Sequence, residues 1–469
     1  MYPTGRLPRG TGCRWLVWVA SLTTAAAMAA APAKAAEMGF AQAYEAAIAH
    51  DPAYRAALHA RDAMRLQEPI ARAALLPVVA LNLSTAEVEG TRGFTNAINQ
   101  DVRVRVEYQT PQAALSVRVP LLNVDGIAGV SLAQAQIAVA EEQFRLERID
   151  LVDRLAEASF QLLAAQETAR LLARLVESRM QQLAQAVARL ARGEGTRVQV
   201  AQAQAVLEVD RSRSIEADNQ LAVARQAVTR ITGLLEPSVP RLPETPSPVP
   251  LQPVTLAEWL GVALRSSPSL RLREQALEVA RVAVLRQQAG HFPRLDAVGS
   301  LSRQESDSVA NIGQRTTLKT IGVQLSVPLF SGGGVDASVR QARARQLQAE
   351  EELRQERENL QFDVTRLWQA VRSSAARMRA LVESQASGAV ALRGAERALA
   401  EGLGVAAEVA DVRAAAIETE RQMLLARIEH LRSRTRLQLR AGVLDDDVVA
   451  DLDRSWQPPR AVNEGSTGP

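Results

Sequence analysis

Two carboxylates in the C-terminal part of the chain are spaced so that they can act together. Glu408 and Asp411 are three positions apart and follow Gly402-Leu403-Gly404, so on a helix they share one face. Carboxylates gathered on one face attract cations and repel anions. Two acids on a helix are more often part of a solvated face, so the pair alone leaves both interpretations open.

The other residue types that perform chemistry do not form a constellation. The four histidines, His50, His59, His291 and His430, lie far apart and in no HExxH arrangement. Gly332-Gly333-Gly334 is not followed by the lysine of a phosphate-binding loop, and no GxSxG is present. We therefore interpret the histidines as solvated or interface residues, and expect a protein that is not an enzyme, with no cofactor and no metal ion.

The first 35 residues have the composition of an export signal. Arg6, Arg9 and Arg14 precede an uncharged apolar run from Trp15 to Ala31, and Ala33-Lys34-Ala35 is a small-residue cleavage site. An uncleaved membrane anchor is disfavoured, because the run is shorter than the about 20 residues that span a bilayer. We expect residues 1–35 to be a cleaved signal peptide.

Removal of this segment changes the charge of the chain. The full sequence has a formal net charge of +3, and the segment carries four basic residues and no acidic one, which leaves 3 − 4 = −1. The balance gives no reason to expect a nucleic acid partner. Cys13, the single cysteine, lies before the apolar run and is removed with it, so it is not a lipidated first residue. No later segment is apolar enough to span a bilayer as a helix, so any membrane part must consist of strands.

The rest of the chain contains an internal duplication. Landmarks recur in the same order at nearly constant offset: Asp51-Pro52 and Ser267-Pro268, Leu76-Pro77 and Phe292-Pro293, Pro120 and Pro328, Gly126 and Gly334, Phe160 and Trp368, Gly193 and Gly402. We expect a first repeat at 36–235, a proline-rich linker at 236–254, a second repeat at 255–440 and an acidic, flexible tail at 441–469.

Each repeat has the same predicted order of elements: a short helix, a medium helix, two strands, a long helix and a returning helix. The medium helix of the first repeat is predicted from about Pro52 to Leu75, and the long helices from Val124 to Arg192 and from Val335 to Glu401. Apolar and polar residues alternate in four predicted strands, separated in the first repeat by a polar loop. Strand-to-helix turns are predicted at Pro120, Gly126, Pro328, Gly332, Gly333 and Gly334, and helical hairpin turns at Gly193, Gly195, Gly402 and Gly404.

These elements have a consequence for assembly. Four strands do not close a barrel, and an open sheet edge in hydrocarbon leaves backbone groups unpaired, so several chains would have to share one barrel. The helical hairpins, about 100 Å long at 1.5 Å per residue, would then form a tube continuous with it. Two alternatives stay open on the residues alone: a periplasmic structural coiled coil with small sheets, and a periplasmic adaptor, which also has helical hairpins.

The quoted segments resemble the TolC-type outer membrane channels over nearly the whole mature chain. The similarity lies in the order of AQAYEAAIAHDP at 41–52, the turns ALLP and GHFP, the strand exits VPLL and VPLFSGGG, and the hairpins GEGTRVQVAQAQA and GLGVAAEVADVRA. The resemblance implies a mainly α protein with membrane β-strands: a homotrimer with a 12-stranded outer membrane barrel and a periplasmic helical tunnel that ends in an iris.

The resemblance also implies partners. Channels of this family work either in protein export with an ABC transporter or in drug efflux with a proton-driven pump, in both cases with a periplasmic adaptor. Drug-efflux members often have a lipidated N-terminal cysteine and a longer extension, which this sequence lacks. It looks more like the type I secretion branch, and within that branch the resemblance suggests the channel for a large calcium-binding RTX toxin such as cyclolysin; the alternative is the duct of a multidrug efflux pump. We expect a location in the outer membrane, contact with its lipid and a secreted protein as cargo.

The acidic pair acquires a role from the same resemblance. In the family, acids at the places of Glu408 and Asp411 point into the bore and constrict it, and threefold symmetry would stack them as carboxylate rings. Family channels are also held shut by links from a tyrosine, an arginine and an aspartate. The corresponding residues here are Leu399, Gly404 and Gln199, so those links are absent and we expect a less tightly latched iris.

Overall fold

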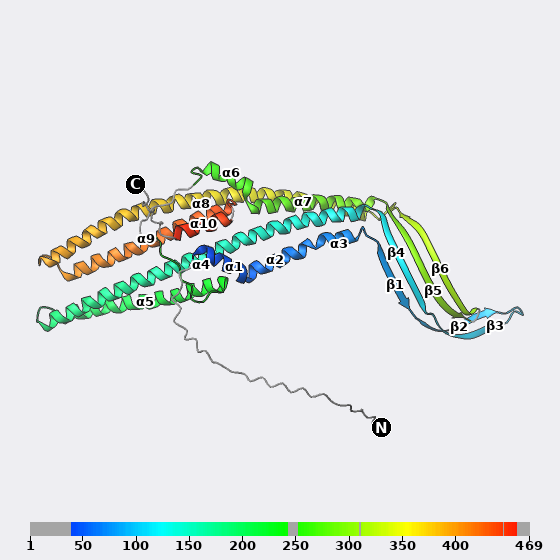
Figure 1. Cartoon of the computed structure of the whole chain (residues 1–469), viewed down its shortest axis with the longest axis horizontal. Coiled ribbons are helices and arrows are strands. Elements are labelled where there is room, and N and C mark those ends of the chain that lie inside the picture. Colours follow the sequence, from blue (N-terminus) through cyan, green and yellow to red (C-terminus); the bar gives the residue numbers. More distant parts are fainter. Residues whose placement is uncertain (1–38, 243–251, 309–310, 444, 457–469) are drawn as a thin grey trace, which may run out of the picture. The chain divides into compact units, whose positions relative to one another are not determined.

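The two repeats contain helices and strands in nearly the same order. The computed structural model describes residues 39–242, 252–308, 311–443 and 445–456 (Figure 1). The predicted signal peptide lies outside these residues, as do residues 243–251 of the predicted linker and residues 457–469 of the predicted tail. The first repeat comprises α1 (Phe40–His50), α2 (Pro52–Arg65), α3 (Gln67–Ala73), β1 (Val78–Ser84), β2 (Glu87–Thr95), β3 (Asp101–Gln109), β4 (Gln112–Asn123), α4 (Val124–Ala191) and α5 (Arg197–Thr232).

The second repeat follows the same order without the β2–β3 insertion. It comprises α6 (Leu256–Ser266), α7 (Pro268–Gln288), the short 3-10 helix η1 (Ala289–His291), β5 (Arg294–Ser308), β6 (Asn311–Ser326), α8 (Gly334–Ala400) and α9 (Ala406–Arg440), and is followed by α10 (Asp445–Trp456). The predicted duplication of long helical hairpins is therefore present in the fold.

The medium helix of the first repeat is interrupted, whereas its counterpart α7 is continuous. Residues 52–75 were predicted as one helix, but α2 ends at Arg65 and α3 begins at Gln67. Pro69 explains the break, because proline has no N–H to donate and its ring clashes with the carbonyl four residues earlier. No proline follows Pro268 in α7.

A capped helix start in the first repeat is also a tertiary contact. The buried carboxylate of Asp51 accepts a hydrogen bond from the Tyr54 N–H at 3.0 Å, and Pro52 occupies the first helical position. The same carboxylate accepts from Arg154 Nη2 of α4 at 3.0 Å. Burial opposes ionisation of Asp51, but the Arg154 and Tyr54 hydrogen bonds outweigh it, and the pKa of Asp51 lies below its ordinary value.

The strands form two sheets. β1, β4, β5 and β6 lie side by side in an antiparallel four-stranded sheet in that order, and β2 pairs only with β3 (Figure 1). The predicted polar loop of the first repeat is thus wrong: residues 87–109 form a hairpin. Its signal was the alternation of Val102, Val104, Val106 and Tyr108, which are half-buried, with charged neighbours that are exposed.

The two faces of the four-stranded sheet differ in polarity. One face carries Leu81, Leu115, Leu301 and Ile321, and the exposed fractions of these side chains run from 40% for Leu115 to 94% for Ile321. The opposite face is largely polar, with Asn82, Ser84, Ser116, Arg118, Asp296, Ser300, Ser302, Gln304, Thr316, Thr320 and Gln324. In one chain the apolar face is therefore left without cover.

The helices pack as two hairpins that contact each other. α4 pairs with α5 and α8 with α9, while α4 also packs against α7 and α9. Apolar residues of α4 also recur at alternating spacings of four and three, and this seam comprises Val176, Met180, Leu183, Val187 and Leu190. It is incompletely buried, since the exposed fraction is 43% for Met180 and 48% for Val187. The fully buried core instead lies further toward the N-terminus of α4, where Leu151, Leu155 and Phe160 meet α1, α5, α9 and α10.

The start of the expected flexible tail is a packed helix. α10 places Val448, Val449 and Leu452 in the same core as α1 and α4. Two of its acidic residues have partners: Asp451 pairs with Arg434 at 2.9 Å, and Asp453 accepts from the Ala41 N–H of α1 at 3.4 Å. The tail expectation is wrong for residues 445–456, because apolar positions spaced i, i+1 and i+4 give this acidic segment one buried face.

Candidate functional site at the helical hairpins

Both helical hairpins turn through a left-handed glycine. Gly193 has φ of 79° and Gly402 has φ of 74°, a region that residues with a Cβ rarely adopt. Each turn makes the same pair of hydrogen bonds. In the first, Gly193 N–H donates to the Leu190 carbonyl and Glu194 N–H to the Arg189 carbonyl. In the second, Gly402 N–H donates to Leu399 and Leu403 N–H to Ala398. These two hydrogen bonds form a Schellman motif, which commonly ends α-helices.

The second glycine of each turn is required by close approach. A Cβ on Gly195 would lie 3.2 Å from the backbone nitrogen of Leu190, and a Cβ on Gly404 would lie 3.0 Å from that of Leu399. The chain therefore passes directly over the end of the preceding helix. The two glycines of each turn thus have different tasks, the first conformational and the second steric.

The strand-to-helix junctions of the two repeats differ, contrary to the expectation of matching turns. Pro120 lies inside β4, beside a register shift, and Gly126 is the third residue of α4. Asn123 forms the junction: its side chain accepts from the Gly126 N–H at 3.0 Å and donates to the Ala74 carbonyl at 3.1 Å. A side-chain cap thus replaces the predicted glycine turn.

The second junction does use glycines. β6 ends at Ser326, before Pro328, and α8 begins at Gly334. Gly332 and Gly333 have φ of 62° and 76°, and a Cβ on either would meet nothing within 4 Å. Their requirement is therefore conformational.

The structure places the predicted acidic pair on the exposed side of α9. Glu408 and Asp411 lie in the first two turns of this helix, and both side chains are exposed, while Val409 and Ala410 between them are buried. Within the described residues, neither carboxylate has a hydrogen bond or an ion pair. The pair therefore carries charge that no described residue neutralises.

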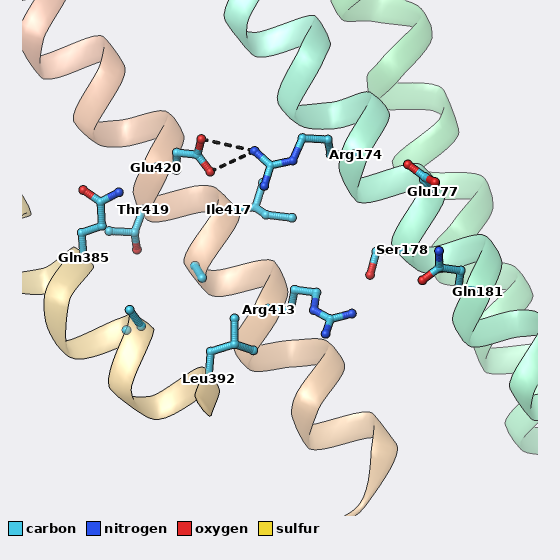
Figure 2. Close-up of a pocket in the computed structure, with 13 residues that line it drawn as sticks. Arg174, Glu177, Ser178, Gln181, Gln385, Leu392, Arg413, Ile417, Thr419 and Glu420 are labelled. Atoms are coloured by element: carbon cyan, nitrogen blue, oxygen red, sulfur yellow. Dashed lines mark hydrogen bonds and ion pairs between the residues drawn. The ribbon is translucent and has the colours of Figure 1, made fainter. Parts of the chain in front are cut away.

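A groove between the two hairpins lies further along α9. It has a volume of about 480 Å³ and is lined by residues of α4, α8 and α9 (Figure 2). Arg174 of α4 points across it toward Glu420 of α9, with Nη1 at 3.3 and 3.4 Å from the two carboxylate oxygens. Arg413, also at the groove, pairs with Glu396 of α8 at 2.7 Å. None of these four residues was predicted from the sequence. Arg174 and Glu420, for example, are 246 positions apart, and no local pattern links them.

More ion pairs join α4 to α9 beyond the groove. Arg432 pairs with Glu157 at 2.8 Å, and Arg436 pairs with Asp153 and with Glu157, each at 3.5 Å. Burial raises the pKa of Asp153 above its ordinary value, although the Arg436 guanidinium opposes the shift. The contact between the hairpins thus combines the apolar core with a series of charge pairs between α4 and α9.

The three positions at which the family links are absent have other contacts. Gln199 accepts from the Thr196 N–H of its own helix start at 3.0 Å from the side-chain carbonyl, Leu399 is half-buried, and Gly404 is in the tight turn. The side chain of Gln199 is therefore occupied by a capping box.

No helix among the described residues combines the length and the apolar character that a membrane crossing needs. They also contain no group of three or more side chains arranged to hold a metal ion.

Comparison with known proteins identifies relatives of the whole chain. It is 29% identical over 420 residues to the alkaline protease secretion protein AprF of Pseudomonas aeruginosa, covering 89% of this chain and 86% of the relative. It is 28% identical over 440 residues to the proteases secretion protein PrtF of Dickeya chrysanthemi, covering 91% and 93%. The crystal structure of the CmeC outer membrane channel of Campylobacter jejuni has the same fold, with a TM-score of 0.73 at 14% identity and coverage of 89% and 90%.

The family follows from the two repeats together. The model of the outer membrane efflux protein family matches residues 43–234 and 259–443, which include both helical hairpins and all four strands of the larger sheet. The resemblance to TolC-type channels, the mainly α fold with membrane strands and the outer membrane location are thereby confirmed. This chain belongs to the outer membrane efflux protein family.

Proposed function

We propose that three copies of this chain form the outer membrane duct of a type I protein secretion system. The observation that carries the proposal is the four-stranded sheet, which has one exposed apolar face and two unpaired edges, β1 and β6. Two relatives named for protease secretion support protein as the cargo. Export of a calcium-binding RTX toxin stays a prediction.

The need to close the sheet supports a barrel shared by several copies, and the resemblance to TolC-type channels implies that there are three of them. An unpaired strand edge in hydrocarbon costs several kcal/mol for each unpaired backbone group, so β6 of one copy must pair with β1 of the next. Three copies of four strands make a barrel of 3 × 4 = 12 strands. The apolar face then meets lipid and the polar face lines the lumen.

The helices extend the same assembly into the periplasm. α4 and α8, with 68 and 67 residues, are each about 100 Å long at 1.5 Å per residue. Neighbouring copies would cover the exposed seam residues Met180 and Val187 of α4, which makes the hairpins a closed helical tunnel. At its inner end Glu408 and Asp411 would form two carboxylate rings that constrict the pore.

The duct needs partners and no cofactor of its own. A periplasmic adaptor would dock it to an inner membrane ABC transporter, which supplies the energy. Because the chain belongs to this family, we no longer favour the two alternative interpretations, a periplasmic adaptor and a structural coiled coil.

Deletion of the gene tests the export role. We expect the cargo protein to disappear from the medium and to accumulate in the cell, and the wild-type protein to fractionate with the outer membrane as a heat-modifiable oligomer. Unchanged secretion in a strain without a second channel gene would contradict the proposal.

A duct for a multidrug efflux pump is the second candidate, favoured by the description of the matched family. The same deletion strain separates the two. If it becomes more sensitive to antibiotics and still secretes all its proteins, efflux rather than protein secretion is the function.

A further inference from the structure

The outer end of the apolar sheet face carries a group of charged side chains that the secretion function does not use. Arg303 and Glu305 of β5 lie on this face, and Arg315 and Lys319 of β6 lie opposite or diagonal to them in the register. Glu305 accepts ion pairs from both arginines, at 3.2 Å from Arg303 and 2.7 Å from Arg315. These four residues have a net charge of 3 − 1 = +2 and are here called the strand-end cation cluster.

Lys319 is the unusual member of the cluster. Apart from Lys34 it is the only lysine of the sequence, in which the other basic residues are arginines and histidines. It is exposed, lies directly opposite Leu301, and precedes Ile321 and Val323 on the same apolar face. It forms no hydrogen bond or ion pair with the described residues. A charge at the end of an apolar face, without a partner among the described residues, is available to a group outside the chain.

The position of the cluster relative to the apolar band fits the edge of a lipid leaflet. From Leu325 to Lys319 the strand advances about 20 Å at about 3.3 Å per residue, and Arg315 lies about 13 Å further out. Strands of outer membrane barrels tilt by about 40°, so the about 33 Å from Leu325 to Arg315 corresponds to about 25 Å along the membrane normal, which is the height of the apolar band of such barrels. A lysine near the end of the band extends its ammonium group to the headgroup level while its methylene stem stays in the apolar layer.

A cavity of about 440 Å³ adjoins the cluster. It is lined by Arg303 and Glu305 together with the apolar side chains of Leu83, Pro111 and Ala113, among others. It therefore offers a cationic group and an apolar wall side by side. That combination suits a molecule with an anionic headgroup and an acyl chain.

We propose that the strand-end cation cluster binds the phosphate groups of a phosphorylated glycolipid in the outer leaflet of the outer membrane. The assignment to the outer leaflet rests on the proposed function, because it requires that the long helices lie in the periplasm and the opposite strand ends face outward. Phosphate oxygens would accept from Lys319 and Arg303, and the acyl chains would cover Leu83, Leu301 and Ile321. The lipid neutralises the excess charge of the cluster and fixes the depth of the barrel in the membrane.

Binding of one defined lipid tests the site. The purified wild-type oligomer in phosphatidylethanolamine nanodiscs is titrated with lipid A that carries both phosphates, and bound lipid is counted by native mass spectrometry. A cation near an anionic headgroup contributes about a fivefold change in affinity. We expect Lys319→Gln and Arg303→Gln each to weaken binding about fivefold and the double variant about 25-fold, if the two contributions add.

Controls separate charge from fold and lipid from free phosphate. Lys319→Arg and Arg345→Gln, which removes an exposed arginine of α8, should bind as the wild type does. Dephosphorylated lipid should bind weakly, and millimolar inorganic phosphate should not displace the lipid. Equal binding of both lipids, displacement by inorganic phosphate, or unchanged binding by the double variant would each overturn the proposal.

Pore formation in planar bilayers is recorded with the same samples. Wild-type pores together with unchanged lipid binding in the variants contradict only the lipid site. Absence of pores from the wild-type protein contradicts the proposed function.

Discussion

At the residue scale, the ion pair between the buried Asp51 and the half-exposed Arg154 joins the start of α2 to the middle of α4. Replacement of Asp51 by asparagine removes this charge-assisted hydrogen bond, while Arg154 keeps its ion pairs with Asp150 and Glu147. We expect Asp51→Asn to lower the free energy of unfolding by about 2 kcal/mol, measured by thermal melting of the helical circular dichroism signal. Asp62→Asn, on the exposed side of α2, is the control and should leave the melting temperature unchanged.

The same pair has a defined pH dependence. Because the pKa of Asp51 is lowered in the folded state, its contribution is complete above the unfolded pKa of about 3.9 and is lost as the pH falls toward the folded value. The difference in stability between wild type and Asp51→Asn should therefore shrink below about pH 4. A constant difference between pH 7 and pH 3 would contradict this assignment.

The acidic pair of α9 makes a prediction about ion selectivity. Glu408 and Asp411 are exposed and have no charge partner among the described residues, so in the proposed trimer they would set the potential at the constriction. We expect Glu408→Gln with Asp411→Asn to reduce the cation preference of the pore severalfold, seen as a shift of the reversal potential toward zero in a salt gradient. Glu216→Gln on α5 is a matched exposed acid that should leave the reversal potential unchanged.

At the element scale, the second glycine of the α8–α9 turn is set by steric contact. A Cβ on Gly404 would lie 3.0 Å from the backbone nitrogen of Leu399 and 3.2 Å from the carbonyl carbon and the Cβ of Ala398. We expect Gly404→Ala to destabilise the hairpin turn by about 1–3 kcal/mol and to increase proteolysis at 400–406. Gly394→Ala, inside α8 with nothing within 4 Å of the new Cβ, should instead be neutral or stabilising.

Among the ion pairs between α4 and α9 in the described residues, the pair of Arg174 and Glu420 across the groove lies nearest the hairpin turns. We expect Arg174→Gln to loosen the two hairpins and to raise single-channel conductance in planar bilayers, because one restraint between α4 and α9 is removed. The exchanged pair, Arg174→Glu with Glu420→Arg, should return the conductance toward the wild-type value. If the exchange and the single variant conduct alike, the pair does not restrain the hairpins.

The elements that were predicted correctly have one clear periodicity. The long helices and the four strands of the larger sheet showed the helical or the two-residue period over many residues. The hairpin β2–β3 was missed because charged residues alternate with Val102, Val104 and Val106, which makes a half-buried strand resemble a polar loop. α10 was missed because its acids were interpreted as solvated, although Val448 and Leu452 share a face.

The sites were less accessible to sequence reasoning than the elements. Glycine turns at Gly193 and Gly402 are visible because glycine has few other reasons to interrupt such helices. Arg174 and Glu420 are 246 positions apart, and they meet only because of the way α4 packs against α9. No short sequence pattern encodes that packing. The first strand-to-helix junction was misplaced because an asparagine cap can replace a glycine turn.

At the scale of the whole molecule, α10 connects the two ends of the described chain. It contributes Val448 and Leu452 to the core that α1 and α4 share, and Asp453 accepts from the start of α1. We expect Leu452→Ala to lower the free energy of unfolding by about 2–4 kcal/mol and to reduce the yield of the oligomer on gel filtration. Val254→Ala, an exposed apolar residue in the segment before α6, should leave both unchanged.

The unequal junctions of the two repeats have a mechanical consequence. β4 runs into α4 through Asn123, whose side chain is bonded on both sides, whereas β6 is joined to α8 through left-handed glycines with open space around them. In the proposed duct, torque on the tunnel would therefore be carried to the barrel by the first repeat, whereas the glycine junction would let the second repeat turn. An opening motion that leaves the barrel undisturbed would rotate the α8–α9 hairpin relative to a comparatively stationary α4–α5 hairpin.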